Sequence, residues 1–148
     1  MKKTIKLLFV AISLLLSKSV MATENIIDSS QLPKKVVQFI QKYYSKEKMS
    51  IINFEKNFFS GDEYEVILTN GTLIEFNEDG EWKDIECKNS NIVHMEIIDK
   101  RITEVIKKKF PSNNVIKIER SSRDTEIELD NDIELIFNKN EALVRIDR

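Results

Sequence analysis

The sequence predicts an α+β protein made of two tandem helix-plus-antiparallel-meander repeats, with the helices on one face of the sheet. Three observations support this prediction. Apolar and polar residues alternate in several short segments, which is the period of strands with one buried face. Two other segments carry apolar residues at helical spacing. Both patterns occur twice in the same order, which indicates a duplication.

The first strand pattern lies within residues 64–86 and begins with a hairpin. Val66 and Ile74 can face the same core only if Thr69-Asn70-Gly71 forms the loop between their strands. Such a three-residue loop ends in a left-handed residue, and its glycine adopts that conformation without a Cβ penalty. A two-residue Asn-Gly turn is the alternative, but it would place Val66 opposite Glu75 and divide the apolar set between the two faces.

A turn at Asn77 to Gly80 then leads into a third strand, Trp82 to Ile85. The same meander recurs in weaker form from Thr125 to Asp147. Both turn glycines are lost there, because Asp132 and Glu141 stand in their places. We therefore expect strained or altered turns in the second copy, partly compensated by hydrogen bonds from Asx side chains.

Each strand pattern is preceded by an amphipathic helix. The first helix begins at Leu32-Pro33, where proline is tolerated because its missing N–H would have no partner within the helix in the first turn. Its apolar stripe, which we expect to be buried, includes Val36 and Ile40. Asp99 is the predicted N-cap of the second helix, and Pro111 ends it. Because a unit of this size alone is only marginally stable, we expect the two repeats to share a core.

The chain begins with a predicted signal peptide, residues 1–22, because lysines precede an apolar run that ends near small residues. An uncleaved anchor is the alternative, although the run is short for a bilayer span. The remaining boundaries follow from the patterns above. They are a flexible leader at 23–31, repeat 1 at 32–86, a linker at 87–97 and repeat 2 at 98–148.

Charge and composition exclude several classes of function. Removing the four lysines of the signal segment from a chain of formal net charge −2 leaves about −6, so we expect no nucleic-acid partner. The single cysteine, Cys87, excludes an intramolecular disulfide. It is best explained as a half-buried small residue, with intermolecular pairing or thiol chemistry as alternatives.

No catalytic constellation is present in the sequence. His94 is the only histidine, so neither a Ser-His-Asp triad nor a histidine-rich metal cluster can be assembled. Three glycines are too few for a phosphate-cradling loop in addition to the turns. Pairs of carboxylates are abundant, but no cleft motif flanks them. We therefore expect that the protein is not an enzyme.

The candidate binding residues lie on the sheet face opposite the helices, between the buried positions. They are Trp82, Ile67, Leu73, Glu126, Glu128 and Glu134. Trp82 reaches this face if strand parity holds, whereas a bulge would reverse its direction; aromatic residues of this kind are favoured in binding hot spots. The acidic side chains fit an ordinary solvated face, a docking surface for a basic partner, or a Ca²⁺ site at Asp130 and Asp132. No EF-hand spacing is present.

The order of these short motifs resembles the PepSY-like family of exported bacterial proteins, whose tandem repeat is similar to the β-lactamase inhibitor protein fold. The matching motifs are Leu32-Pro33, Tyr64-x-Val66-x-Leu68, Asn70-Gly71, Ile74-x-Phe76, Gly80-x-Trp82-Lys83 and Ile85-x-Cys87. His94 and Asp99 replace two prolines usual in the linker. The resemblance implies one curved sheet with the helices on its convex side and an open concave face suited to docking another protein.

Together, the patterns and the resemblance predict an exported, non-catalytic binding module, periplasmic or secreted, for an exported protein or peptide. An inhibitor-like role toward a secreted enzyme is the form of this function that the family implies, although a fold does not establish a function. A periplasmic small-ligand or Ca²⁺ sensor is the alternative, and a structural duplicate without a ligand is a third. No cofactor beyond Ca²⁺ and no stable membrane insertion after signal removal are expected.

Overall fold

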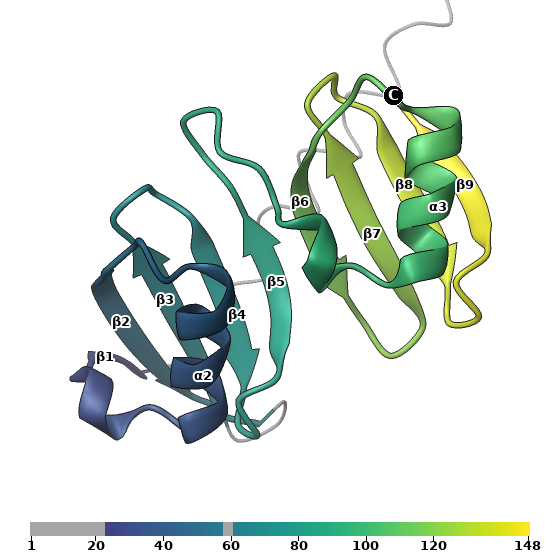
Figure 1. Ribbon diagram of the computed structural model, residues 1–148. Helices are drawn as coiled ribbons and strands as arrows, with labels where there is room; N and C mark the ends of the chain where they lie inside the picture. Colours follow the sequence, from purple (N-terminus) through teal and green to yellow (C-terminus); the bar gives the residue numbers. More distant parts are fainter. Residues whose placement is uncertain (1–22, 58–60) are drawn as a thin grey trace, which may run out of the picture.

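The computed structural model describes residues 23–57 and 61–148 and contains one antiparallel sheet with two α-helices (Figure 1). The predicted signal peptide lies outside the described residues. The nine strands are hydrogen-bonded in chain order from β1 to β9, so every strand pairs with its sequence neighbours. The prediction of an α+β fold with an antiparallel sheet is confirmed, and more of the described residues lie in strands than in helices.

The first half of the described chain, residues 23–57 and 61–86, holds five strands and one α-helix. They are β1 (Thr23–Ile26), a 3-10 helix η1 (Ser29–Gln31), α2 (Lys34–Tyr43), β2 (Met49–Lys56), β3 (Glu63–Leu68), β4 (Leu73–Asn77) and β5 (Trp82–Glu86). The second half, residues 87–148, holds the rest. These are a 3-10 helix η2 (Met95–Ile97), α3 (Lys100–Lys109), β6 (Val115–Arg120), β7 (Asp124–Leu129), β8 (Glu134–Asn138) and β9 (Leu143–Asp147).

Both helices cover the same face of the sheet, α2 over the strands of the first half and α3 over those of the second (Figure 1). Val36 and Ile40 of α2 and Ile102 and Ile106 of α3 are buried in one continuous hydrophobic core. The halves meet where β5 pairs with β6 and Ile85 lies opposite Ile118. Ile85 is 0% exposed and Ile118 is 1% exposed, so the core runs unbroken through the junction.

The first hairpin has the predicted register. Val66 lies opposite Ile74, and the Gly71 N–H donates to the Leu68 carbonyl at 2.9 Å across a three-residue loop. Gly71 adopts a φ of +83°. This is the left-handed region in which a side chain is strained, so the prediction that glycine closes this loop is confirmed.

The corresponding turns of the second half are strained, as predicted. Asp132 has a φ of +62° and Glu141 a φ of +61°, both in the left-handed region. At the last turn, the Asn138 side-chain oxygen accepts hydrogen bonds from the backbone N–H groups of Asn140 at 2.9 Å and Ala142 at 3.1 Å. This Asx turn gives the predicted compensation.

The segment expected to be a flexible leader is ordered instead. Thr23 to Ile26 form β1 and pair with β2. Asp28 then caps η1, because its side chain accepts a hydrogen bond from the Ser30 N–H at 2.9 Å while its own N–H donates to the Gln31 side chain. The prediction of a leader was wrong because strand pairing with β2 satisfies the backbone of a segment too short and polar to show a strand pattern.

Candidate functional site

A row of carboxylates crosses five neighbouring strands on the sheet face turned away from the helices. The residues lie directly opposite one another from β3 to β7. This acidic row consists of Glu65, Glu75, Asp84, Glu119 and Glu126. The intervening positions, such as Ile74 and Ile85, are buried under the helices, so strand alternation places the row on the open face.

The acidic row is electrostatically unfavourable, because like charges directly opposite each other destabilise an antiparallel pair. Lys117 provides partial relief: its Nζ lies 3.3 Å from Asp84 Oδ2 and 3.9 Å from Glu119 Oε2. At the β3 end, Asn53 donates a hydrogen bond to Glu65 at 2.8 Å. The other carboxylate oxygen of Asp84, Oδ1, is buried, and no residue in the described part of the chain donates a hydrogen bond to it. The row therefore carries more negative charge than its neighbours neutralise.

Burial and mutual repulsion change the titration of these groups. Burial raises the pKa of Glu75, and the charges of Asp84 and Glu63 raise it further. Burial also raises the pKa of Asp84, although the nearby Lys117 opposes that shift. For Lys117, the neighbouring carboxylates outweigh burial and raise the pKa. The centre of the row thus favours a proton or a cationic group.

The second half of the open face contains an acidic hollow of about 330 Å³ over β6 to β8. Lys117 is the cation among its lining side chains. The carboxylates that line it are Glu119, Glu126, Glu128, Asp132 and Glu134. Glu128 lies directly opposite Glu134. Partial burial, together with the hydrogen bond and charge of Glu134, raises the pKa of Glu126. The structure thus brings together the three glutamates that the sequence predicts.

The first half of the open face is more apolar. Ile51 lies opposite Ile67, and Ile67 lies opposite Leu73. We call these three residues the apolar patch. The predicted contacts Ile67 and Leu73 are therefore adjacent and belong to the same face as the acidic row. An apolar patch beside a concentration of carboxylates suits a partner that combines cationic and apolar side chains.

Trp82 does not lie on this face, so its predicted place was wrong. The pairing of β4 with β5 shifts by one residue between Glu75 and Phe76, and Trp82 lies opposite Phe76. Phe76 is fully buried, and Trp82 packs against the same core on the helix side. The corresponding shift in β8 and β9 places Leu143 opposite Phe137, also on the helix side. A bulge reverses strand parity, and simple alternation does not reveal it.

The two aspartates of the predicted Ca²⁺ site face different surroundings. The Asp130 carboxylate accepts hydrogen bonds from the side-chain amides of Asn113 and Asn114, each at 2.9 Å. Asp132 lines the acidic hollow instead. Within residues 23–57 and 61–148, no group of three or more His, Cys, Asp or Glu side chains is arranged to hold a metal ion.

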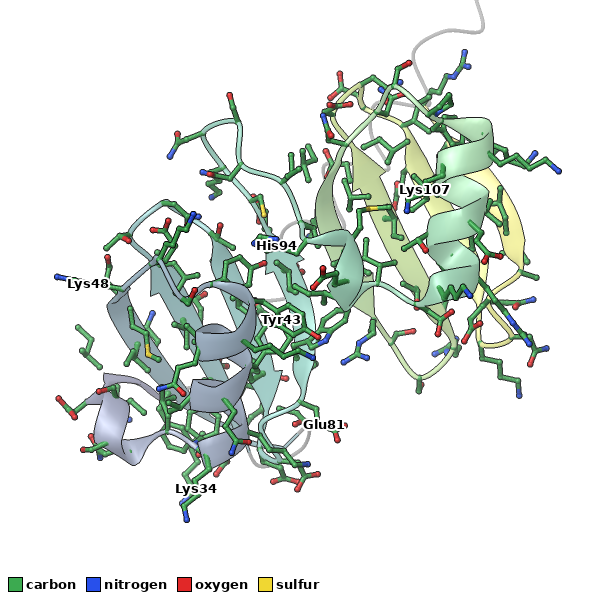
Figure 2. All side chains as sticks on the ribbon, in the orientation of Figure 1. Lys34, Tyr43, Lys48, Glu81, His94 and Lys107 are labelled. Atoms are coloured by element: carbon green, nitrogen blue, oxygen red, sulfur yellow. The ribbon has the colours of Figure 1, made fainter. Side chains whose placement is uncertain are left out.

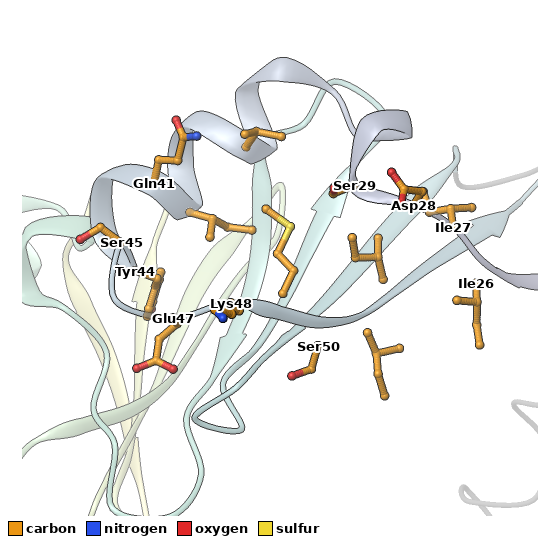
Figure 3. Close-up of a pocket in the computed structure, with 15 residues that line it drawn as sticks. Ile26, Ile27, Asp28, Ser29, Gln41, Tyr44, Ser45, Glu47, Lys48 and Ser50 are labelled. Atoms are coloured by element: carbon orange, nitrogen blue, oxygen red, sulfur yellow. The ribbon is translucent and has the colours of Figure 1, made fainter.

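Another hollow lies between α2, η1 and β2, with a volume of about 620 Å³ (Figure 3). Its inner wall includes Ile40 and Ile52. Polar side chains such as Gln41, Glu47 and Asp28 lie around its rim and do not converge (Figure 3). A ligand site needs a few polar groups directed to one place, so the open sheet face is the stronger candidate.

His94 lies between the two halves, and its ring packs edge-on against Tyr44 with 5.0 Å between the ring centroids (Figure 2). Cys87 is buried, and its Sγ lies 3.9 Å from the Thr72 hydroxyl. Burial raises the pKa of the Cys87 thiol, which disfavours the reactive thiolate. Both residues therefore contribute to packing at the junction.

A sheet covered by helices on one face and bare on the other defines a class of α+β proteins with an exposed sheet surface. The chain belongs to the PepSY-like family, described as proposed β-lactamase-inhibitor-like proteins, whose model matches residues 18–60 and 62–145. No curated protein sequence matches this chain.

Three solved structures share the fold with a TM-score of 0.80 each. One is a proposed calcium-regulated periplasmic protein of Bacteroides thetaiotaomicron, 34% identical, with 84% of this chain and 97% of that chain covered. Two are proposed periplasmic proteins of Bacteroides vulgatus. One is 29% identical, with 84% of this chain and 97% of that chain covered. The other, of unknown function, is 30% identical, with 85% of this chain and 100% of that chain covered. None of the helices in the described part of the chain is long and apolar enough to cross a membrane.

Proposed function

We propose that this protein is an exported, non-catalytic binding module that holds a basic segment of another exported protein or peptide on the open face of its sheet. The observation that carries the proposal is the acidic row. Its directly opposed carboxylates cost folding stability, and a cationic partner would offset their repulsion. The periplasmic relatives support a periplasmic location, and the family name supports an inhibitor-like role toward a secreted enzyme as one form of this binding.

Two kinds of contact would hold the partner. Glu126, Glu128 and Glu134 would receive lysine or arginine side chains in the acidic hollow, with charge-assisted hydrogen bonds. Ile67 and Leu73 would receive apolar side chains at the other end of the face. Trp82 has no part in this site, because it lies on the helix side.

The face is continuous because the two halves form one sheet, and we propose that they are tandem repeats. Their core pairs support this, since Val66 opposite Ile74 corresponds to Ile127 opposite Leu135. The order of one helix followed by four strands also occurs in both halves. Duplication would explain how one open surface extends across nine strands.

Calorimetric titration with a synthetic peptide of alternating lysine and leucine tests the proposal. We expect saturable binding at low ionic strength that weakens as salt screens the charges. The double variant Glu128→Gln/Glu134→Gln should bind at least about tenfold more weakly, which corresponds to the loss of one charge-assisted hydrogen bond. The matched control is Glu104→Gln on α3, which lies outside the site. Equal affinity of the wild type and the double variant would refute the proposal.

A Ca²⁺ or small-ligand sensor is the second candidate. The name of the Bacteroides thetaiotaomicron relative and the carboxylates of the acidic hollow favour it. It predicts an upward thermal shift in millimolar Ca²⁺ that Asp132→Asn abolishes. Asp130→Asn should leave the shift intact, because Asn113 and Asn114 already engage that carboxylate. No shift in Ca²⁺ would remove this candidate.

A further inference from the structure

The helix side of the sheet has its own groove, of about 430 Å³, where α2 meets β5 and β6. It lies beside the junction of the two halves, and Tyr43 and Glu81 mark its α2 side and its β5 side (Figure 2). Its cations and aromatic rings come from three elements. We call this the junction groove, and the side chains that matter are Lys35, Lys42, Tyr43, Glu81, Trp82 and Arg120.

Arg120 is held in a fixed orientation in the junction groove. Its guanidinium carbon lies 3.5 Å from the centroid of the Trp82 ring, and its Nη2 donates to the Trp82 carbonyl at 2.5 Å. The stack and the hydrogen bond set the plane of the guanidinium, whose other N–H groups remain available for a carboxylate. Among the described residues, no salt bridge joins Arg120 to a carboxylate. Partial burial lowers the pKa of Arg120, and the negative charge of Glu81 opposes that shift.

The other charges leave the junction groove positive. Lys35 Nζ lies 3.4 Å from Glu81 Oε1, so these two charges offset each other. Lys42 Nζ lies 4.6 Å from the centroid of the Tyr43 ring. Two cations, Arg120 and Lys42, thus each lie against an aromatic ring. The local sign is opposite to that of the acidic row on the other side of the sheet.

We propose that the junction groove binds an acidic peptide segment, with one carboxylate on the fork of Arg120 and a second near Lys42. The apolar parts of the segment pack on Trp82 and Tyr43. A peptide fits better than a free inorganic anion because the groove offers two separate cations with ring surfaces beside them. This site goes beyond the proposed function: with the acidic row occupied on one face and the junction groove on the other, the protein can bridge a basic and an acidic chain.

Trp82 is the only tryptophan, so its fluorescence reports directly on the junction groove. The test titrates the mature protein with a synthetic peptide of alternating glutamate and phenylalanine and, as a matched ligand, the same peptide with glutamine for glutamate. We expect a saturable change in Trp82 emission with the glutamate peptide alone. Arg120→Gln should weaken binding by at least about tenfold by calorimetry, which does not depend on the altered fluorophore.

Two further variants make the result specific. Arg120→Lys keeps the charge but loses the planar fork, and its affinity should fall between those of the wild type and Arg120→Gln. Lys108→Gln, an exposed cation on α3, should bind as the wild type does. Circular dichroism and thermal unfolding confirm that each variant is folded.

Four results would overturn the proposal. They are the absence of saturable binding, equal binding of the glutamine peptide, equal weakening by Lys108→Gln, and displacement of the peptide by inorganic phosphate at the same concentration. Sedimentation of the protein alone supplies a further check. Self-association that Arg120→Gln abolishes would assign the groove to a second copy of the chain and would also overturn the proposal.

Discussion

The turns of the two halves show how one residue decides local strain. Gly80 has a φ of +74°, and a Cβ there would lie 3.1 Å from the Cβ atoms of both Lys35 and Pro33 at the start of α2. Glycine is required at this turn for its conformation and for the close approach of the helix. Glu141 holds the corresponding place with a φ of +61° and an ion pair, in which Arg101 Nε lies 3.6 Å from Glu141 Oε2. The second half accepts backbone strain at a position where the first half has none.

Glu141→Gly should stabilise the protein relative to Glu141→Ala by about 1 kcal/mol, because both remove the carboxylate but only glycine relieves the left-handed strain. Both variants lose the exposed ion pair with Arg101, and such a pair contributes little to stability, so it does not affect the comparison between them. Urea unfolding followed by circular dichroism measures the difference. Equal midpoints for the two variants would show that the turn is unstrained.

Alternation along single strands predicted most of the candidate site. Ile67, Leu73, Glu126, Glu128 and Glu134 reach the open face because a strand turns successive side chains to opposite faces. The position of Trp82 was not predicted correctly, because the one-residue shift in the pairing of β5 with β4 depends on the partner strand. The residues next to Trp82 in the sequence do not indicate that shift.

At the scale of elements, the acidic row exists only because five strands are in register. Asp84 and Glu119 belong to different halves and meet through the pairing of β5 with β6. No pattern within either segment places them opposite each other. The row and its repulsion could therefore not be predicted from the sequence, although the acidic character of β7 could.

Glu75, at the centre of the row, should make stability depend on pH. Its pKa in the folded protein is raised above the ordinary value, so the native state binds a proton more readily than the unfolded state does. The free energy of unfolding therefore increases as pH falls from the pKa of Glu75 in the folded protein to its pKa in the unfolded chain. It decreases again as pH rises through the same interval.

Glu75→Gln removes this penalty and should be more stable than the wild type at neutral pH. Solvent screening limits the gain to less than about 1 kcal/mol. The gain should shrink as acid protonates Glu75 in the wild type. Urea unfolding at a series of pH values measures it, with Glu104→Gln on α3 as the control outside the row. A Glu75→Gln protein that is less stable at neutral pH would contradict this account.

At the scale of the whole molecule, the two halves share one core and should unfold together. Ile118 lies opposite Ile85 at the junction, and neither is exposed. Ile118→Ala should cost about 2–5 kcal/mol, the range for a large side chain truncated in a core. Ile51→Ala is the control and should cost much less, because Ile51 is 44% exposed. Trp82 fluorescence and circular dichroism should report one transition for each protein, and two separate transitions would show that the halves are independent.

The molecule is also divided by charge. Carboxylates dominate the open sheet face, whereas α2 and α3 carry most of their charge as lysine and arginine. The net charge of the chain does not indicate this separation, because it is a sum over all charged residues and contains no information on their positions in the fold. This arrangement of opposite charges on opposite sides of the sheet is a property of the folded chain alone.

The sequence by itself determined the helices, most strands, the first hairpin register and the loss of turn glycines in the second half. These features depend on local periodicity and on the conformational range of single residues. Only the tertiary structure decided that residues 23–26 join the sheet, that Trp82 and Arg120 meet in the junction groove, and that carboxylates align across five strands. The physical reason is that strand pairing joins residues distant in sequence, and its register and bulges are set by the packing of the whole sheet.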